Sequence, residues 1–298
     1  MTLTVLLSAY NGEKYIREQI DSILAQEGDF SLSLLVRDDG STDSTHAILN
    51  EYAAAGRLTW YAGDNLGPAG SFLELLRRAE DADYFAFADQ DDRWLPGKLA
   101  AAIERLDGHA EPALYAANAT LVDSTLQPLG RDVYRTPPRT DFYTVVCSGG
   151  LLGCTMVMNA ALAAHVRQNP APQKTRLHDY YVLALCTAVG GTVLYDDTPR
   201  LLYRQHGGNV VGVTARKRDA LKQRVTEITT RSTISIADQA ATLLPYAATE
   251  RERAWLTQVA NYRRNIFTRL GLALSRKPRY ASRNMAVKLR LAILLGNR

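Results

Sequence analysis

The sequence predicts an α/β fold, in which a mostly parallel sheet flanked by helices is followed by a basic helical extension. Short apolar runs alternate with segments of helical periodicity near the start of the chain, which indicates βαβ units. Charge divides the chain, because residues 213–298 contain 18 Lys and Arg against 5 Asp and Glu, whereas residues 1–212 contain 17 against 26. We therefore expect an acidic α/β body, residues 1–212, and a basic helical region, residues 213–298.

The body opens with four expected strands. They are the apolar runs at residues 3–7, 34–36, 58–61 and 84–88. Between them, apolar residues recur at helical spacing, first at Ile16, Ile20 and Ile23 and then within residues 48–52 and 72–79. The runs are apolar throughout, as is typical of parallel strands buried on both faces.

The rest of the body is less regular. We expect strands at residues 114–122, 154–158, 191–195 and 200–203, and helices at residues 160–166 and 177–189. Pro128, Pro137 and Pro138 fall within residues 124–144, which we interpret as a mobile loop. The small residues of 147–153 predict a turn. From about residue 215 the sequence becomes helical and basic.

The composition excludes several classes of protein. Apolar residues make up 46% of the 298 residues, which is normal for a globular protein with a substantial core. The three cysteines lack Cys-x-x-Cys spacing, which indicates free thiols in a reducing compartment. No apolar run is long enough to span a bilayer, and the start of the chain lacks a basic leader. We expect a cytoplasmic protein without a signal peptide.

Three carboxylates follow the fourth expected strand, in Asp89-Gln90-Asp91-Asp92. Clustered carboxylates repel one another unless a cation lies among them, and oxygen ligands suit Mg²⁺ or Mn²⁺. The alternative is a solvated acidic turn before a helix over residues 96–106. Ligands of open α/β sheets bind beyond the carboxyl ends of the strands. The other expected strands are followed, at the same edge of the sheet, by Tyr10, Asn11, Asp38, Asp39, Asn65 and Gly67.

Neither of the common phosphate-binding loops is present in the sequence. No Gly-x-Gly-x-x-Gly follows Leu7, and no Gly-x-x-x-x-Gly-Lys-Ser/Thr occurs. A sugar-1-phosphate nucleotidyltransferase would need a glycine-rich loop with Arg and Lys after the first strand, and that loop is also missing. A nucleotide at this edge would depend on a metal ion to hold its diphosphate.

Six blocks of the body occur in a characteristic order. They are Ser8-Ala9-Tyr10-Asn11-Gly12, Asp38-Asp39-Gly40-Ser41-Thr42-Asp43, Asn65-Leu66-Gly67, Asp89-Gln90-Asp91-Asp92-Arg93-Trp94, His178-Asp179-Tyr180-Tyr181 and Tyr203-Arg204-Gln205-His206. Together they resemble the GT-A-fold glycosyltransferases of family 2, specifically the bacterial rhamnosyltransferase-like members. The resemblance covers residues 3 to about 212 and leaves the basic region outside it.

The resemblance implies how the donor nucleotide sugar would be bound. The residues that would contact it are Ala9, Tyr10, Asn11, Asp38, Asp39, Asn65, Asp89, Gln90 and Arg204. Asp91 and His206 would bind Mn²⁺ or Mg²⁺ at the diphosphate. Asp38 and Asp39 would otherwise cap the next helix, and Asn65 would be a turn residue. Arg204 would contact phosphate or form a structural ion pair, and His206 would otherwise bond to the backbone.

Asp179 is the expected general base. Glycosyl transfer requires that an acceptor hydroxyl lose its proton as it attacks the anomeric carbon. The residues next to Asp179, which are His178, Tyr180 and Tyr181, would lie on the acceptor side of the site, where aromatic rings stack on sugars. The alternative is that Asp179 caps a helix. The resemblance implies a single in-line displacement with inversion.

The resemblance also implies a donor and an acceptor. The first expectation is L-rhamnose from dTDP-L-rhamnose, transferred to a growing, lipid-linked surface polysaccharide. The alternatives are a UDP-hexose or UDP-N-acetylhexosamine transferase, and a non-catalytic glycan-binding or nucleic-acid-binding protein. The acidic body argues against nucleic acid as a partner.

The basic region suggests a contact outside the catalytic body. Clusters at Arg216-Lys217-Arg218, Arg263-Arg264 and Arg276-Lys277-Pro278-Arg279 punctuate helical sequence. For residues 276–298 we expect an interfacial helix on an anionic membrane, peripheral on the cytoplasmic face of the inner membrane. Alternatively, these helices pack on the body or on a second copy of the chain. In that case, the apolar face through which these helices pack would consist of Trp255, Tyr262, Ile266 and Leu270.

Overall fold

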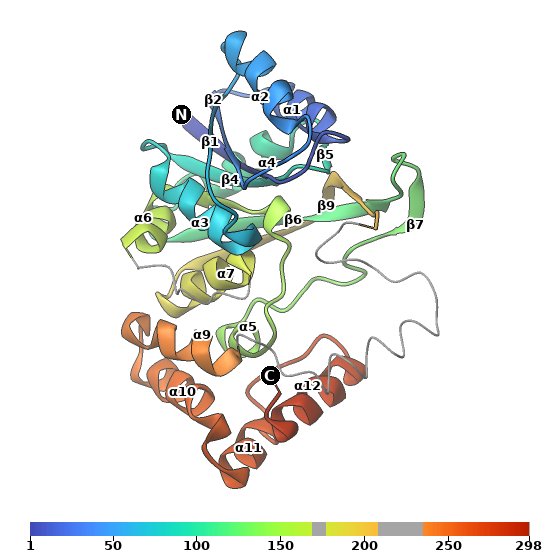
Figure 1. Cartoon of the computed structure of the whole chain (residues 1–298). Coiled ribbons are helices and arrows are strands. Elements are labelled where there is room, and N and C mark those ends of the chain that lie inside the picture. Colours follow the sequence, from blue (N-terminus) through green and yellow to red (C-terminus); the bar gives the residue numbers. More distant parts are fainter. Residues whose placement is uncertain (169–176, 208–234, 298) are drawn as a thin grey trace.

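The computed structural model of the chain describes residues 1–168, 177–207 and 235–297. The expected domain boundary at residue 212 and the cluster Arg216-Lys217-Arg218 lie outside the described residues. The described chain forms a helix-flanked sheet with a group of helices at one end (Figure 1). An α/β fold with a helical C-terminal region is therefore confirmed.

The first half of the sheet is parallel, as expected from the βαβ pattern. Its elements are β1 (Thr2–Ala9), α1 (Ile16–Leu24), β2 (Ser31–Asp38), α2 (Thr45–Ala54), β3 (Thr59–Ala62), α3 (Gly67–Arg78) and β4 (Tyr84–Asp89). The four strands lie side by side in the order β3-β2-β1-β4. The register pairs Ala9 with Asp38 and Ser8 with Asp89, so three strands end at one edge.

The second half of the sheet is mixed rather than parallel. Its elements are β5 (Arg93–Trp94), α4 (Lys98–Leu106), β6 (Ala113–Val122), β7 (Pro128–Asp132), α5 (Phe142–Ser148), β8 (Val157–Asn159), α6 (Ala160–Gln168), α7 (His178–Ala188) and β9 (Thr192–Arg204). Strand β8 is antiparallel to both β4 and β6, and β9 is parallel to β6. The short β5 adds an antiparallel strand outside β9.

Three expectations for this half need correction. The expected strands at residues 191–195 and 200–203 are one strand, β9, whose register jumps from Asp196 to Pro199 along β6. The expected loop of residues 124–144 contains β7 and the start of α5. The first residues of the expected turn at 147–153 belong to α5, because that helix extends to Ser148. Cys147 is fully buried in it. Tertiary pairing decides these elements, and local propensity does not reveal it.

Helices cover both faces of the sheet, and the side chains alternate between two cores. On β4, Phe85 and Phe87 belong to the core shared with α3, α6 and α7, whereas Tyr84, Ala86 and Ala88 belong to the core shared with α1, α2 and α4. Adjacent strand residues point to opposite faces, so a run that is apolar throughout is buried from both sides.

The C-terminal helices are α9 (Ile236–Leu243), α10 (Glu250–Ala260), α11 (Ile266–Ala273) and α12 (Arg283–Leu295). Trp255 and Tyr262 are fully buried in the core that also contains α7, so α10 packs on the body (Figure 1). The expected core stripe is wrong for its other members, because Ile266 is 53% and Leu270 38% exposed. Over the described ranges, every helix is too short or too polar to cross a membrane.

Candidate active site

The edge where β1, β2 and β4 end opens into a pocket of about 440 Å³. Eight of the predicted site residues line it: Tyr10, Asp39, Asn65, Asp89, Gln90, Asp91, His178 and Asp179. Residues that were not among the predicted site residues also line it: Ser8, Gly67, Pro68, Phe72, Leu152, Gly153, Cys154, Leu177 and Tyr203. The pocket therefore combines a cluster of carboxylates with an apolar wall, and its size suits a small ligand.

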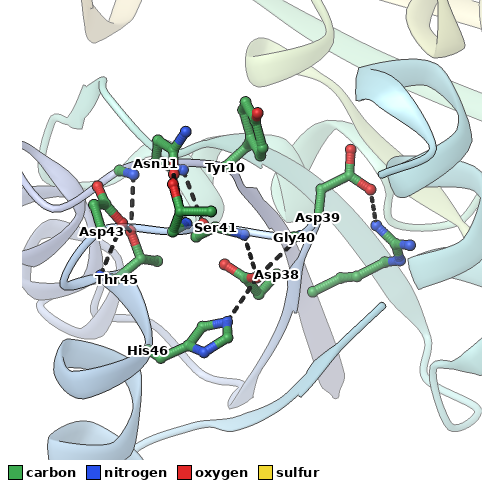
Figure 2. A network of polar contacts seen from close by, with 12 residues as sticks. Tyr10, Asn11, Asp38, Asp39, Gly40, Ser41, Asp43, Thr45 and His46 are labelled. Carbon is green, nitrogen blue, oxygen red and sulfur yellow. Dashed lines mark hydrogen bonds and ion pairs between the residues drawn. The ribbon is translucent and has the colours of Figure 1, made fainter. Parts of the chain in front are cut away.

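Two predicted residues hold loops together instead of lining the pocket (Figure 2). The Asp38 carboxylate accepts hydrogen bonds from the backbone N–H groups of Gly40 and Ser41, at 3.0 and 2.8 Å, and pairs with His46 at 2.8 Å. Burial alone would raise its pKa, but the hydrogen bonds from Ser41 and His46 hold the pKa of Asp38 below its ordinary value. Asn11 similarly accepts from the Thr42 backbone N–H at 2.8 Å. Asp38 thus shapes the loop after β2, and Asn11 ties that loop to the one after β1.

Asp39 lines the pocket and is also paired behind it. Its carboxylate pairs with the Arg37 guanidinium and accepts a hydrogen bond from the Leu66 N–H at 2.8 Å. Both partners of the ion pair are almost completely buried, and Arg37 also donates to the Asp64 carbonyl at 2.7 Å. The pair joins the end of β2 to the loop before α3, which carries Asn65.

We expect Asp39→Ala to lower the free energy of unfolding by about 3–5 kcal/mol, because it leaves the buried Arg37 guanidinium without its counter-charge. Urea denaturation measures the loss. Asp64→Ala is the matched control, since Asp64 is an exposed acid of the adjoining loop. Equal stability of the two variants would contradict this account of the pair.

Gln90 fastens the first loop to the end of β4. Its side-chain oxygen accepts from the Tyr10 N–H at 2.8 Å, and its amide nitrogen donates to the Tyr10 carbonyl at 2.9 Å. Gly12 allows this approach, because a Cβ there would lie 2.2 Å from the Gln90 side-chain oxygen. Gln90 thus positions Tyr10, a residue that lines the pocket and is 48% exposed.

The acidic stretch after β4 lies against the end of β9. Asp91 Oδ2 and His206 Nε2 are 2.7 Å apart, although 115 residues separate them in the chain. Burial, and then the charges of Asp91 and Asp179, raise the pKa of Asp89 to about 7. A divalent cation would relieve this crowding of carboxylates, because carboxylate oxygens suit Mn²⁺ or Mg²⁺, and an added imidazole is acceptable for Mn²⁺. The residues present therefore fit such an ion.

Cys154 is a member of this cluster that sequence reasoning missed. Ligand atoms of Asp89, Asp92 and Cys154 all lie within 4.8 Å of one another. Burial, followed by the charges of Asp92 and Asp89, raises the pKa of the Cys154 thiol well above its ordinary value. The thiol stays neutral among the carboxylates, and no local sequence signal identifies it.

Arg204 is buried behind the pocket, which favours the structural alternative for its role. Its Nε donates to the Asp91 carbonyl at 2.7 Å, its guanidinium pairs with Glu18, and its charge lies 4.5 Å from the centre of the Tyr15 ring. Its backbone N–H donates to Asp92 at 3.1 Å. These contacts bind the acidic stretch to the end of β9 and so bring His206 to Asp91.

Asp179 lies in the first turn of α7 and faces the pocket. Its carboxylate accepts hydrogen bonds from the backbone N–H groups of Gly153 and Tyr180, at 3.2 and 2.6 Å. Burial outweighs these hydrogen bonds and raises its pKa to about 6. A carboxylate with this pKa is mostly ionised near neutral pH and can still accept a proton, as a general base must.

The residues beside Asp179 divide between pocket and core. His178 lines the pocket between the rings of Phe72 and Phe87, at centroid distances of 4.0 and 4.9 Å, and burial lowers its pKa to about 3. Tyr180 and Tyr181 point into the core, and the Tyr180 hydroxyl donates to the Val146 carbonyl. Helix α7 is buried on nearly all sides, so the structure does not support an acceptor-side role for these two rings.

Gly153 allows α7 to approach the pocket this closely. A Cβ on Gly153 would lie 2.3 Å from His178 Nε2 and 3.2 Å from the Asp179 Cβ. We expect Gly153→Ala to displace both side chains, lowering kcat and costing about 1–3 kcal/mol of stability. Gly271→Ala is the control, since its nearest atom would be 3.9 Å away. Wild-type kcat and stability in Gly153→Ala would refute the close-approach argument.

The pocket therefore places a poised carboxylate, Asp179, in the same cavity as a carboxylate pair suited to a cation. This arrangement is typical of enzymes that activate a hydroxyl nucleophile against a diphosphate leaving group. The comparisons with known proteins agree with this class. The sequence profile described as "Glycosyl transferase family 2" matches residues 4–157.

The chain belongs to glycosyl transferase family 2 and is a nucleotide-sugar glycosyltransferase. It is 31% identical over 227 residues to a Shigella flexneri protein described as "dTDP-rhamnosyl transferase RfbG", covering 69% of this chain and 73% of the relative.

Two solved structures share the fold. TarS of S. aureus in complex with UDP-GlcNAc has a TM-score of 0.55 at 17% identity, covering 99% of this chain and 90% of that one. The mannosyltransferase PcManGT from Pyrobaculum calidifontis, in complex with GDP-Man and Mn²⁺, has a TM-score of 0.54 at 18% identity, covering 99% and 74%.

Proposed function

We propose that this enzyme transfers an L-rhamnosyl group from dTDP-L-rhamnose to a growing, lipid-linked surface polysaccharide such as an O-antigen, with inversion at the anomeric carbon. The observation that carries the mechanism is that one pocket contains Asp89, Asp91 and, from a separate helix, Asp179. The S. flexneri relative supports the donor. The apolar wall formed by Phe72 and Leu152 also supports it, because L-rhamnose carries a methyl group where most hexoses carry a hydroxymethyl.

The pocket residues divide the work of the transfer. Asp179 accepts the proton of the acceptor hydroxyl as its oxygen attacks the anomeric carbon and the bond to the donor phosphate breaks. Tyr10 and Asp39 bind the base of the nucleotide. Asp89 contacts the donor beside them, and Asp91 and His206 would hold a divalent cation, Mn²⁺ or Mg²⁺, whose charge would stabilise the departing nucleoside diphosphate.

Thermal stabilisation by a panel of nucleotide sugars tests the donor. A ligand that binds only the folded state raises the melting temperature by mass action. The panel contains dTDP-L-rhamnose, dTDP-glucose, UDP-glucose and UDP-N-acetylglucosamine, each with Mn²⁺, with Mg²⁺ and with chelator. We expect the largest shift with dTDP-L-rhamnose and a metal ion. A larger shift with a UDP-sugar would replace the proposed donor by a UDP-hexose or UDP-N-acetylhexosamine.

The same panel separates the enzyme from non-catalytic alternatives. A glycan-binding protein would be stabilised by sugar without a need for nucleotide or metal. A nucleic-acid-binding protein would respond to DNA or RNA in a salt-dependent manner and to no nucleotide sugar. Turnover is then established if dTDP is released only when an acceptor glycan is present. A lipid-linked acceptor would require the enzyme to work at the cytoplasmic face of the inner membrane.

A further inference from the structure

Helices α11 and α12 expose large apolar side chains in two ordered rows. Six of the eleven exposed large hydrophobic residues of the described chain lie on this helix pair, and a seventh, Leu274, caps the C-terminus of α11. The most exposed are Phe267, at 79%, and Leu274, at 70%. On α12 the exposed residues Val287, Leu291 and Leu295 recur every four positions, so they share one face of that helix. Large apolar side chains exposed together on neighbouring helices mark a candidate interaction site.

The buried faces of the same helices show that the rows are not part of the core. Leu272 and Ala273 of α11, and Leu289 and Ile293 of α12, are almost completely buried. The two helices contact each other and lie at the end of the molecule opposite α1 and α2 (Figure 1). Each helix therefore has an inner face that holds it to the protein and an outer row without a partner among the described residues.

The charge around the rows indicates what covers them. Residues 263–297 contain nine Lys and Arg residues and no Asp or Glu. Among the exposed members are Arg264, Arg276, Arg279 and Arg283. A second copy of this chain docked face to face would bring like charges together, which is unfavourable. An anionic lipid surface would instead attract the basic residues and accept the apolar rows.

We propose that the α11–α12 face, formed by the rows on both helices and the exposed arginines of the same segment, binds the surface of an anionic lipid bilayer. This site is larger than the helix of residues 276–298 expected from the sequence, because its most exposed residues, Phe267 and Leu274, belong to α11 and to the residue that caps its C-terminus. The inference complements the proposed function, which needs access to a lipid-linked acceptor, but it rests on the surface alone and requires no turnover.

Vesicle flotation of the full chain tests the proposal. We expect flotation with vesicles containing about a third phosphatidylglycerol, no flotation with pure phosphatidylcholine, and weaker binding as the salt concentration rises. Phe267→Ser/Leu274→Ser should lower the partition coefficient about tenfold or more, and Arg276→Glu/Arg283→Glu should do the same. Leu129→Ser and Arg57→Glu are controls, because they change exposed residues on other elements.

The outcomes separate lipid from other occupants and from the catalytic proposal. If anionic vesicles do not bind the protein, or bind the wild type and the α11–α12 variants equally, the proposal is wrong. If light scattering finds a dimer that Phe267→Ser/Leu274→Ser converts to a monomer, and no vesicle binds, a second copy covers the face. The thermal shift with dTDP-L-rhamnose and metal should be equal in wild type and variants, so failure of one proposal leaves the other standing.

Discussion

Asp179→Asn should lower kcat about 10³-fold while donor binding and stability are retained, since general-base catalysis contributes about 10²–10⁴-fold. An amide keeps an oxygen that can accept the hydrogen bond from the Gly153 N–H, but it cannot accept the proton of the hydroxyl. The measurement is kcat from release of nucleoside diphosphate, with donor affinity from the thermal shift.

Asp238→Asn is the control for a purely structural effect. Asp238 also lies in the first turn of a helix, α9, where it forms a capping box with Ser235, and it does not line the pocket. Loss of that cap should reduce stability by about 1 kcal/mol and leave kcat unchanged. If Asp179→Asn behaved like Asp238→Asn, Asp179 would only cap α7.

The pH dependence of the wild type follows from the same carboxylate. Burial raises the pKa of Asp179 to about 6, and only the ionised form can accept a proton. We therefore expect kcat/KM to increase with pH through about 6 and to level off above it, because kcat/KM reports the free enzyme. A profile that is flat between pH 5 and about pH 8 would argue against Asp179 as the base.

Asp91→Asn should remove the metal-dependent part of the donor's thermal shift and lower kcat about 10³-fold. The reason is that a bound cation provides several kcal/mol of charge stabilisation at the leaving diphosphate, and each 1.36 kcal/mol is about tenfold in rate. Asp91 is also the residue that contacts His206, so the variant alters two of the expected ligands together.

Asp29→Asn is the matched control for Asp91→Asn, because it makes the same change of charge at an exposed acid that does not line the pocket. It should leave the shift with Mn²⁺ and the rate unchanged. A metal-dependent shift that persisted in Asp91→Asn would mean that this carboxylate is not a ligand. In that case Asp89 and the neighbouring Asp92 would be the residues to change next.

Local patterns in the sequence are sufficient for the parallel half of the sheet and for the carboxylates of the pocket. Apolar runs such as residues 84–88 are long, uninterrupted and bounded by turn formers, and a parallel strand buried on both faces leaves this signature. Because parallel strands point the same way, their polar ends meet at one edge. For this reason the amino-acid sequence is enough to group Tyr10, Asp39 and Asp89, which do line one pocket.

Only the tertiary structure decided which polar residues serve the pocket and which serve the fold. Asp38 and Asp39 are neighbours with the same chemistry, yet one carboxylate ties a loop through Ser41 and the other lines the pocket. Arg204 is likewise held by Glu18, far away in the chain. Such contacts join segments that are far apart in the sequence, so the local sequence around each residue does not predict them.

The same distinction applies to the surface. The sequence by itself determined that the C-terminal region is helical, basic and free of acids after Glu252. It did not determine which apolar residues are buried, because Tyr262 and Ile266 are only four positions apart in the sequence and have opposite exposures. Their fates depend on where α10 and α11 pack against the body. That packing depends on contacts among several segments of the core, so it cannot be predicted from the sequence of one segment alone.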